Sequence, residues 1–257
     1  MSGLKVNPAK MSVSDVTDKI PEYGTTLRTF EDLKNTVYND TPAMYVFRPS
    51  IDQYKRCLSR ENRKEFRMLL KANKFQFHVI LPEGILDTGV AAFFQCTSLI
   101  SVTLPEGLEE ITNDAFAECS SLTSINLPEG LHKIGTRAFQ GCSSLAVATL
   151  PQGLQVLGGS AFDGCSSLTS VTLPRGLQWI AVNVFRGCSS LTSVTLQQGL
   201  QVIGAGAFQG CSSLISVNLP RGLQRVGESA FQGCSSLTTV TLPYGIRNMG
   251  QNVFFGC

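Results

Sequence analysis

The stretch LTSINLPEGLHKIGTRAFQGCSS, residues 122–144, carries a pattern that most of the 257-residue chain repeats. Cysteine recurs at a strict 23-residue step, at positions 96, 119, 142, 165, 188, 211, 234 and 257. Seven copies of the unit begin at Leu99, Leu122, Leu145, Leu168, Leu191, Leu214 and Leu237, and the last copy stops two residues short, at Cys257. Self-similarity at a period of about 20 to 50 residues indicates units that stack on one another.

Each unit reads as a short strand followed by a turn. Leu122, Ile125 and Leu127 follow the spacing LxxLxL, which points three side chains of a strand into a core. The intervening residues then face outward, namely Thr123, Ser124 and Asn126. Pro128 cannot donate a ladder hydrogen bond and Gly130 permits turn dihedrals, so the chain must turn after the strand.

A second apolar set follows the turn, with Leu131, Ile134, Ala138 and Phe139, and Cys142 closes the coil. This spacing indicates a short return segment in which the small alanine lets neighbouring coils approach closely. One such unit cannot bury its apolar faces alone, whereas stacked copies share a continuous core. At about 4.8 Å between strands, eight coils would offer roughly 35 Å of surface, enough to dock a protein.

The motif LxxLxLPxGLxxIGxxAFxxCSS resembles the BspA-type, or Treponema pallidum-type, leucine-rich repeats over residues 79–257. The resemblance implies an α/β repeat solenoid, a right-handed horseshoe with parallel strands on its concave side. Its return segments would be irregular, 3-10 or β. Such repeats occur in bacterial surface proteins, protist proteins and effectors of intracellular bacteria.

Three regions are expected along the chain: a flexible polar leader at 1–24, a mainly helical N-terminal cap at 25–77, and a repeat array at 78–257. The array holds one partial and seven further repeats, the last truncated. The first residues, MSGLKVNPAKMSVSDV, contain no apolar signal-peptide segment, and no stretch approaches the roughly 18 apolar residues that span a bilayer. We therefore expect no Sec signal and no membrane span.

Within the cap, residues 30–40 and 59–73 predict helices, and 45–47 a strand between them. Ser59 is a candidate N-cap of the second helix. That helix has an apolar side that could seal the first coil, formed by Phe66, Met68, Leu69 and Leu70. Basic residues gather in and before this helix: Lys55, Arg56, Arg60, Arg63, Lys64, Arg67, Lys71 and Lys74. They form either a solvated helix face or a binding patch for an acidic partner or a phosphate-rich surface.

The cysteine column predicts a buried ladder of small apolar side chains. Equivalent residues on stacked coils point the same way, so their Cβ atoms stay too far apart for a disulfide. A line of thiols cannot surround zinc tetrahedrally, and the chain has no CxxC pair. Unpaired thiols favour a reducing cytoplasm. Together with the missing Sec signal, they make the chain resemble an effector of the Legionella kind, delivered to the host cytoplasm.

Catalytic motifs are missing: the chain has no HExxH, no GxxxxGK[ST], no GxSxG and no Rossmann glycine signature after a strand. Of the two histidines, His132 occupies a variable, exposed position of the repeat. Cys57, the one cysteine off the period, and His78 leave open a nucleophilic pair. We expect no enzyme activity, no metal and no cofactor.

The outward strand positions predict a smooth polar binding surface, with short side chains that supply few energetic anchors. It includes Ser124, Asn126, Thr149, Ser170, Thr172, Ser193, Thr195 and Asn218. Charge then divides the array. Residues 78–129 hold eight acids and no base, whereas residues 130–257 hold seven bases and two acids, with Arg175 and Arg221 in turns. This arrangement would orient a dipolar partner, although drift between duplicated coils would look the same.

One variable column reads Asp87, Glu110, Lys133, Val156, Trp179, Val202, Arg225 and Asn248. Interfaces are enriched in tryptophan and arginine, so Trp179 is the leading anchor candidate, with Val156, Val202, Arg175 and the more distant Arg221 and Arg225 around it. Alternatively, Trp179 folds over Gln201 and Val202 as local packing.

The sequence therefore predicts a protein-binding module that modulates or occludes its partner, either a host protein or a bacterial effector enzyme. A structural or adhesive surface protein of the BspA type is the alternative. The modest formal charge of +2 does not indicate nucleic-acid binding. The apolar residues Phe254 and Phe255 suggest a further interaction, end-to-end self-association through the last coil.

Overall fold

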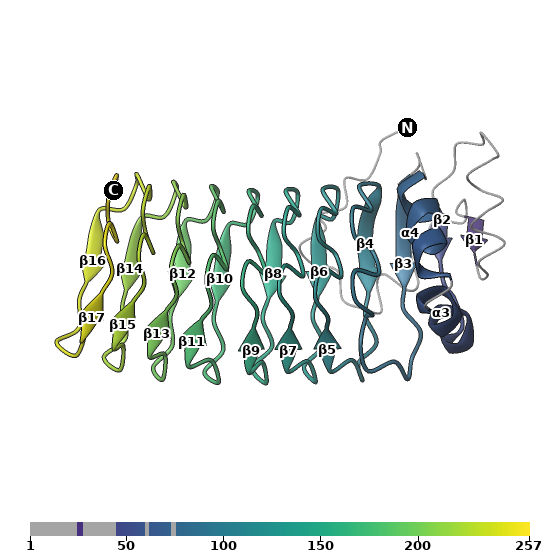
Figure 1. The fold of residues 1–257 in the computed structure, drawn as a ribbon, viewed down its shortest axis with the longest axis horizontal. Coiled ribbons are helices and arrows are strands. Elements are labelled where there is room, and N and C mark those ends of the chain that lie inside the picture. The colour runs from purple at the N-terminus through teal and green to yellow at the C-terminus, as the bar shows by residue number, and fades with distance from the viewer. Residues whose placement is uncertain (1–24, 28–44, 60–61, 73–75) are drawn as a thin grey trace, which may run out of the picture.

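The computed structural model describes residues 25–27, 45–59, 62–72 and 76–257. The array consists of stacked coils in one row, with the helices at the N-terminal end (Figure 1). We number the coils: coil 1 covers 78–98, and coils 2 to 8 begin at the leucines that open each repeat, Leu99, Leu122, Leu145, Leu168, Leu191, Leu214 and Leu237. The predicted fold class is confirmed: a parallel-strand solenoid with 23-residue repeats and few helices.

The LxxLxL segments form a first ladder of parallel strands. Neighbouring strands pair at a shift of one repeat, so that Ser193 lies beside Ser216. The strands are β3 (Phe77–Ile80), β4 (Leu99–Thr103), β6 (Ser124–Asn126), β8 (Val147–Thr149), β10 (Ser170–Thr172), β12 (Ser193–Thr195), β14 (Ser216–Asn218) and β16 (Thr239–Thr241). From β6 to β16 the middle residue of each strand points inward and the two flanking residues, mostly serine, threonine or asparagine, point outward.

A second ladder of two-residue parallel strands follows the Leu-Pro-x-Gly turns, so the return segment begins as β structure. It comprises β5 (Glu110–Ile111), β7 (Lys133–Ile134), β9 (Val156–Leu157), β11 (Trp179–Ile180), β13 (Val202–Ile203), β15 (Arg225–Val226) and β17 (Asn248–Met249). A run of turns then carries each coil back past its phenylalanine and cysteine to the next strand of the first ladder.

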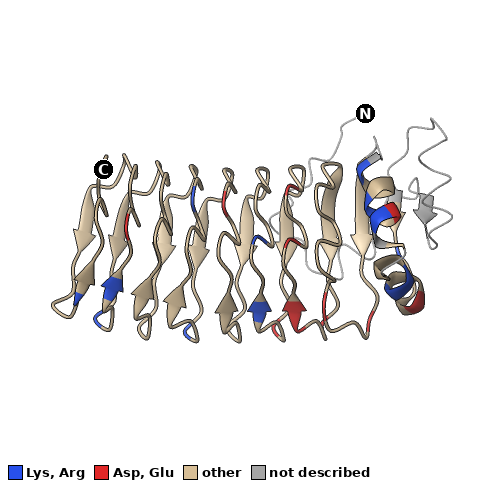
Figure 2. Ribbon diagram, in the orientation of Figure 1, with Lys and Arg blue, Asp and Glu red and all other residues tan. Residues whose placement is uncertain are grey.

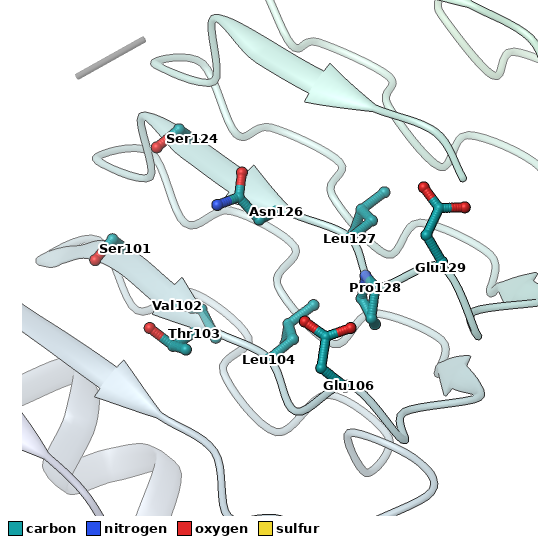
Figure 3. A pocket seen from close by; sticks show the side chains of 10 residues that line it. All are labelled: Ser101, Val102, Thr103, Leu104, Glu106, Ser124, Asn126, Leu127, Pro128 and Glu129. Carbon is teal, nitrogen blue, oxygen red and sulfur yellow. The ribbon is translucent and has the colours of Figure 1, made fainter. Parts of the chain in front are cut away.

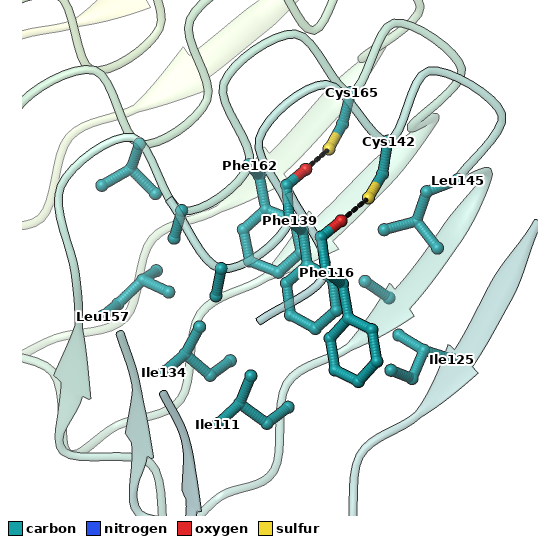
Figure 4. Packing of buried hydrophobic residues seen from close by; sticks show 14 of the residues in the cluster. Ile111, Phe116, Ile125, Ile134, Phe139, Cys142, Leu145, Leu157, Phe162 and Cys165 are labelled. Carbon is teal, nitrogen blue, oxygen red and sulfur yellow. Dashed lines mark hydrogen bonds between the residues drawn. The ribbon is translucent and has the colours of Figure 1, made fainter. Parts of the chain in front are cut away.

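The core is built from columns of identical residues. Phe93, Phe116 and their equivalents up to Phe254 stack face to face, with ring centroids 5.1 to 5.6 Å apart (Figure 4). The cysteines from Cys96 to Cys234 are buried beside these rings, which confirms the predicted thiol ladder. Each thiol from Cys119 onward donates to the carbonyl of the phenylalanine 26 residues earlier, as Cys142 does to Phe116 at 3.1 Å.

Both ladders are interrupted at one place, between coils 4 and 5. Strand β8 does not pair with β10, nor β9 with β11, and Figure 1 shows a wider spacing there. Apart from coil 2, which has Thr112 and still bridges to coil 1 between Asp87 and Glu110, the other coils have glycine after the second strand. A Cβ on Gly158 would lie 2.5 Å from the backbone of Gly135. Coil 5 has Ala181 instead. A Cβ at that separation would clash, and no backbone bond of the second ladder joins coils 4 and 5, whereas the start of the first ladder keeps the bond from the amide of Thr169 to the carbonyl of Ala146 at 3.3 Å.

The return side of coils 4 and 5 stays joined. The amide of Ser160 donates to Val182 at 2.9 Å, and that of Phe162 to Val184 at 2.8 Å. The rings of Phe162 and Phe185 remain stacked at 5.6 Å. We call this one-sided opening the seam.

Before the array, β1 (Thr25–Leu27) and β2 (Tyr45–Phe47) extend the first ladder, and two helices follow, α3 (Ile51–Leu58) and α4 (Arg63–Ala72). The strand at 45–47 is confirmed, and α4 lies within the predicted 59–73. Helix α3 was not predicted. The expected leader at 1–24 and helix at 30–40 lie outside the described residues, as do Arg60 and Lys74.

Two details of the predicted second helix were wrong. Ser59 is the C-cap of α3, and its hydroxyl accepts from the amide of Asn62, one residue before α4 begins. Met68 is exposed rather than part of the apolar side. Phe66, by contrast, is fully buried and packs edge-on against Phe93 at 6.2 Å, so α4 does close the core of coil 1.

No helix in the described part of the chain is long and apolar enough to cross a membrane.

Candidate protein-binding surface

The first ladder presents the predicted polar rows to solvent. Ser124 is half-buried, and the others are exposed: Asn126, Thr149, Ser170, Thr172, Ser193, Thr195 and Asn218. Neighbours in a row can bond to each other, as Thr241 does by donating its hydroxyl to the Asn218 side chain at 3.3 Å. The structure therefore brings these residues together as one uniform face, which we call the hydroxyl face.

The hydroxyl face ends in a hollow of about 210 Å³ between coils 2 and 3 (Figure 3). Ser101, Ser124 and Asn126 line its strand side, while Glu106 and Glu129 stand on adjacent turns at its other side. Both glutamates are exposed. The hollow thus offers carboxylates, an amide and hydroxyls, a set that accepts hydrogen bonds from a cationic group.

The second ladder and the turns before it form another surface, which we call the turn edge. It consists of the variable residue of each Leu-Pro-x-Gly turn and the two variable residues that follow the next apolar position. Arg175 and Arg221 lie exposed in the turns, and Arg225 lies exposed on β15. The sequence analysis expected Arg175 and Arg221 in turns, and the structure puts them with Arg225 on one continuous edge along the array.

Trp179 lies on β11 at the seam, with 47% of its surface exposed. It pairs in register with Val202, which is half-buried. Val156 is also half-buried but lies across the seam on β9, which does not pair with β11. About half of the indole surface is therefore free to contact a partner, and the other half is buried within the chain.

Charge on the turn edge divides along the molecule (Figure 2). Within the described array the ion pairs are Lys133 with Glu110, Arg137 with Asp114, and Arg186 with Asp163. The acids left outside these pairs on the turn edge belong to coils 1 to 3: Glu83, Asp87, Glu106, Glu109 and Glu129. The bases left there belong to coils 5 to 8: Arg175, Arg221, Arg225 and Arg247.

Sequence reasoning did not single out the turn column or the seam. The variable turn residue reads Glu83, Glu106, Glu129, Gln152, Arg175, Gln198, Arg221 and Tyr244, a gradient that was present in the alignment of the repeats. The seam had a weaker signal, alanine in place of glycine at position 181, since Thr112 of coil 2 also replaces this glycine. In the last coil Leu242, Met249 and Phe255 are exposed.

The candidate nucleophilic pair is not assembled. Cys57 is buried in α3, and this burial raises the pKa of its thiol to about 11, so the thiol is protonated at neutral pH. His78 instead shares a hydrogen bond with Ser101 on the neighbouring strand, and burial lowers the pKa of its ring. Among the described residues, no group of three or more His, Cys, Asp or Glu side chains could hold a metal ion.

The sequence profile described as the BspA type leucine rich repeat region (6 copies) matches residues 71–178 and 155–257. Among solved structures, the chain is similar to the leucine-rich repeat protein TpLRR of T. pallidum, with 27% identity and a TM-score of 0.55 over 74% of this chain and 83% of that one. A leucine-rich repeat protein from Eubacterium ventriosum shares the fold at 15% identity and a TM-score of 0.50, over 91% of this chain and 88% of that one.

No curated protein matches the chain significantly in sequence. The family match covers most of the chain and includes all the repeats described above, so the resemblance seen in the sequence is confirmed. The chain belongs to the BspA-type leucine-rich repeat family.

Proposed function

We propose that the chain is a non-catalytic protein-binding module whose partner docks along the turn edge, with Trp179 as the central anchor. The observation that carries this proposal is the half-exposed indole of Trp179 at the seam. Tryptophan and arginine dominate binding energy at protein interfaces, and Arg175 lies on the same coil. The hydroxyl face offers short uncharged side chains instead, so it adds complementarity rather than anchoring.

Occlusion or regulation of the partner is the mode of action that we propose, as for a bacterial effector or an inhibitor of an enzyme. A reducing cytoplasm is the proposed location. The free, buried thiols support this, because disulfides persist mainly in oxidising compartments.

The test is an affinity pull-down under reducing conditions from lysates of the native source and of host cells. The unmodified chain is compared with a Trp179→Ala, Arg175→Glu variant and with a matched control on the hydroxyl face, Ser193→Ala, Thr195→Ala. All four positions are exposed, so the variants should fold like the parent. We expect a partner that the control retains and that the Trp179 variant loses by at least about tenfold, the loss that interface anchors typically cause.

Three other results would count against the proposal. Loss in the control alone would move the binding site to the hydroxyl face. Retention by both variants would exclude the central turn edge. No specific partner in any lysate would favour the structural or adhesive alternative.

A further inference from the structure

The charges of the turn edge are complementary to those of a second turn edge that runs in the opposite direction. Its unpaired acids lie in coils 1 to 3 and its unpaired bases in coils 5 to 8. Between these ends, coil 4 presents Val156 with neutral glutamines, and coil 5 presents Trp179 beside Arg175, which faces the Gln152 of the second copy's coil 4. A dipolar edge with an apolar centre matches another such edge that runs the opposite way.

We infer that a second copy of this chain docks on the turn edge in antiparallel orientation. The inference rests on the proposed function and names an occupant for the same surface. A two-fold axis between coils 4 and 5 sets coil 1 against coil 8, coil 2 against coil 7, and coil 4 against coil 5. The interface is isologous, so every contact occurs twice and the assembly closes as a dimer.

The pairing places opposite charges together. Glu106 of coil 2 faces Arg221 of the second copy's coil 7, and Glu109 lies one column away from Arg225 of that coil. The guanidinium of Arg221 then approaches the hollow that Glu106 and Glu129 border, where its five N–H donors meet carboxylate, amide and hydroxyl oxygens. A parallel side-by-side arrangement would instead set acids against acids and arginines against arginines, which is unfavourable.

The centre of the same interface is apolar. Because the axis passes between coils 4 and 5, Trp179 of one copy faces Val156 of the other, at the seam where β9 and β11 do not pair. Each indole would then bury the half of its surface that is free in the single chain. The chain contains one tryptophan, so its fluorescence reports this contact directly.

The strip is narrow, which sets the expected affinity. Eight coils at about 4.8 Å give a length of roughly 35 Å. Because the turn edge is only three residues wide in each coil, the buried area falls below the ~800 Å² per partner of a stable complex. Exposed charge pairs are also screened over about 8 Å at physiological ionic strength. The dimer should therefore be weak, with a dissociation constant on the order of 10 to 100 µM at low salt.

The experiment uses charge reversal with the purified full chain. An acid-reversed variant carries Glu106→Arg and Glu109→Arg, and a base-reversed variant carries Arg221→Glu and Arg225→Glu. Other coils already hold arginine at the first pair of positions and acids at the second, so each substitution is compatible with the fold. A combined variant carries all four changes and keeps the formal net charge of +2.

Sedimentation velocity at about 10 to 200 µM and low salt measures the self-association, a range chosen to bracket the expected dissociation constant. We expect the wild type to dimerise, with a blue shift of Trp179 emission, and each reversed variant to bind itself more than about tenfold more weakly. An equimolar mixture of the two reversed variants should associate again, and so should the combined variant. This recovery requires acidic coil 2 to meet basic coil 7.

Wild-type chain that stays monomeric throughout this range overturns the inference. So does a dimer that both reversed variants retain, because its interface would lie elsewhere, for example on the exposed apolar residues of coil 8. Failure of the combined variant to recover would exclude the antiparallel register. None of these outcomes touches the proposed function, which stands or falls on the Trp179-dependent capture of a different protein.

Discussion

At the scale of single residues, the array tolerates one buried charge because a neighbouring coil neutralises it. The Asp163 carboxylate is almost fully buried and accepts from Nε and Nη2 of Arg186 at 3.0 and 2.9 Å, and from Gln140 at 3.3 Å. In coils 6 and 7 the same column holds Gln209 and Gln232, whose amides bond at 2.7 Å. The repeat thus supplies its own uncharged version of the contact.

Arg186→Ala should lower the free energy of unfolding by about 1 to 3 kcal/mol, because it leaves the Asp163 carboxylate buried without its charged partner. The double change Asp163→Gln, Arg186→Gln should stay within about 1 kcal/mol of the wild type, since a glutamine pair can replace both charges. Urea unfolding followed by circular dichroism measures both. Equal losses in the two variants would show that Asp163 is not the source of the cost.

The cysteine ladder makes a second prediction at this scale. Burial raises the pKa of Cys119, Cys188 and Cys234 to about 12, and the thiolate is the reactive form. Cys257 is the exposed thiol among the nine. A water-soluble thiol reagent should therefore modify Cys257 alone in the native protein and all nine cysteines after unfolding. Mass spectrometry counts the labels, and a second rapidly labelled cysteine would contradict the buried ladder.

At the scale of elements, stacking of identical segments replaces the contacts that ordinary strands and helices make with different partners. Each phenylalanine of the inner coils lies between two others, as Phe185 does at 5.6 Å from Phe162 and 5.4 Å from Phe208. In the last coil, Phe254 is half-buried and stacks on Phe231 alone. A phenylalanine in the middle of the column should therefore contribute more to stability than the phenylalanine of the last coil.

Phe185→Ala should destabilise the chain by about 3 to 5 kcal/mol, because it leaves a large cavity between two stacked rings. Phe254→Ala is the matched control and should cost less than half as much, since its ring is already partly exposed. Chemical unfolding of both variants measures the difference. Similar losses would mean that the ring column does not stabilise the array through its neighbours.

At the scale of the whole molecule, the seam divides the ladders into two blocks while the return side stays continuous. Elsewhere the second ladder is tied by repeated cross-coil bonds: the amides of Gln201 and Val202 donate to Gln178, and that of Gly204 to Ile180. Within the described chain, the equivalent amides of coil 5, Gln178, Trp179 and Ala181, have no such acceptor in coil 4.

Hydrogen exchange should reveal the seam. The amides of Gln178, Trp179 and Ala181 should exchange at least about tenfold faster than their coil 6 counterparts Gln201, Val202 and Gly204, because exchange follows local opening of hydrogen bonds. Ala181→Gly restores the glycine of coils 4 and 6 and should slow the exchange of the coil 5 amides. NMR-detected exchange measures these sites individually. Equal rates in coils 5 and 6 would contradict the seam.

Much of the fold could be predicted because each coil has nearly the same sequence as its neighbours. A residue such as Phe139 or Cys142 therefore meets copies of itself, and its tertiary surroundings can be inferred from the repeat. The period, the inward positions, the buried thiols and the first ladder followed from this rule, and so did the exposed rows of the hydroxyl face. The partner-binding role of those rows and of Trp179 stays a prediction.

What the tertiary structure alone decided lies where neighbouring coils differ. The seam appears only in the missing strand pairing between coils 4 and 5, since Thr112 of coil 2 replaces the same glycine as Ala181 without opening the ladder. Which acids of the turn edge stay unpaired depends on which carboxylates reach a base in the next coil. Helix α3 lies outside the repeats and is held against coil 1 by the hydroxyl of Tyr54, which donates to the carbonyl of Thr88 at 2.7 Å. The composition and spacing of one unit determine the shape of that unit. Contacts between coils of different sequence depend on how the two coils lie relative to each other, which only the tertiary structure decides.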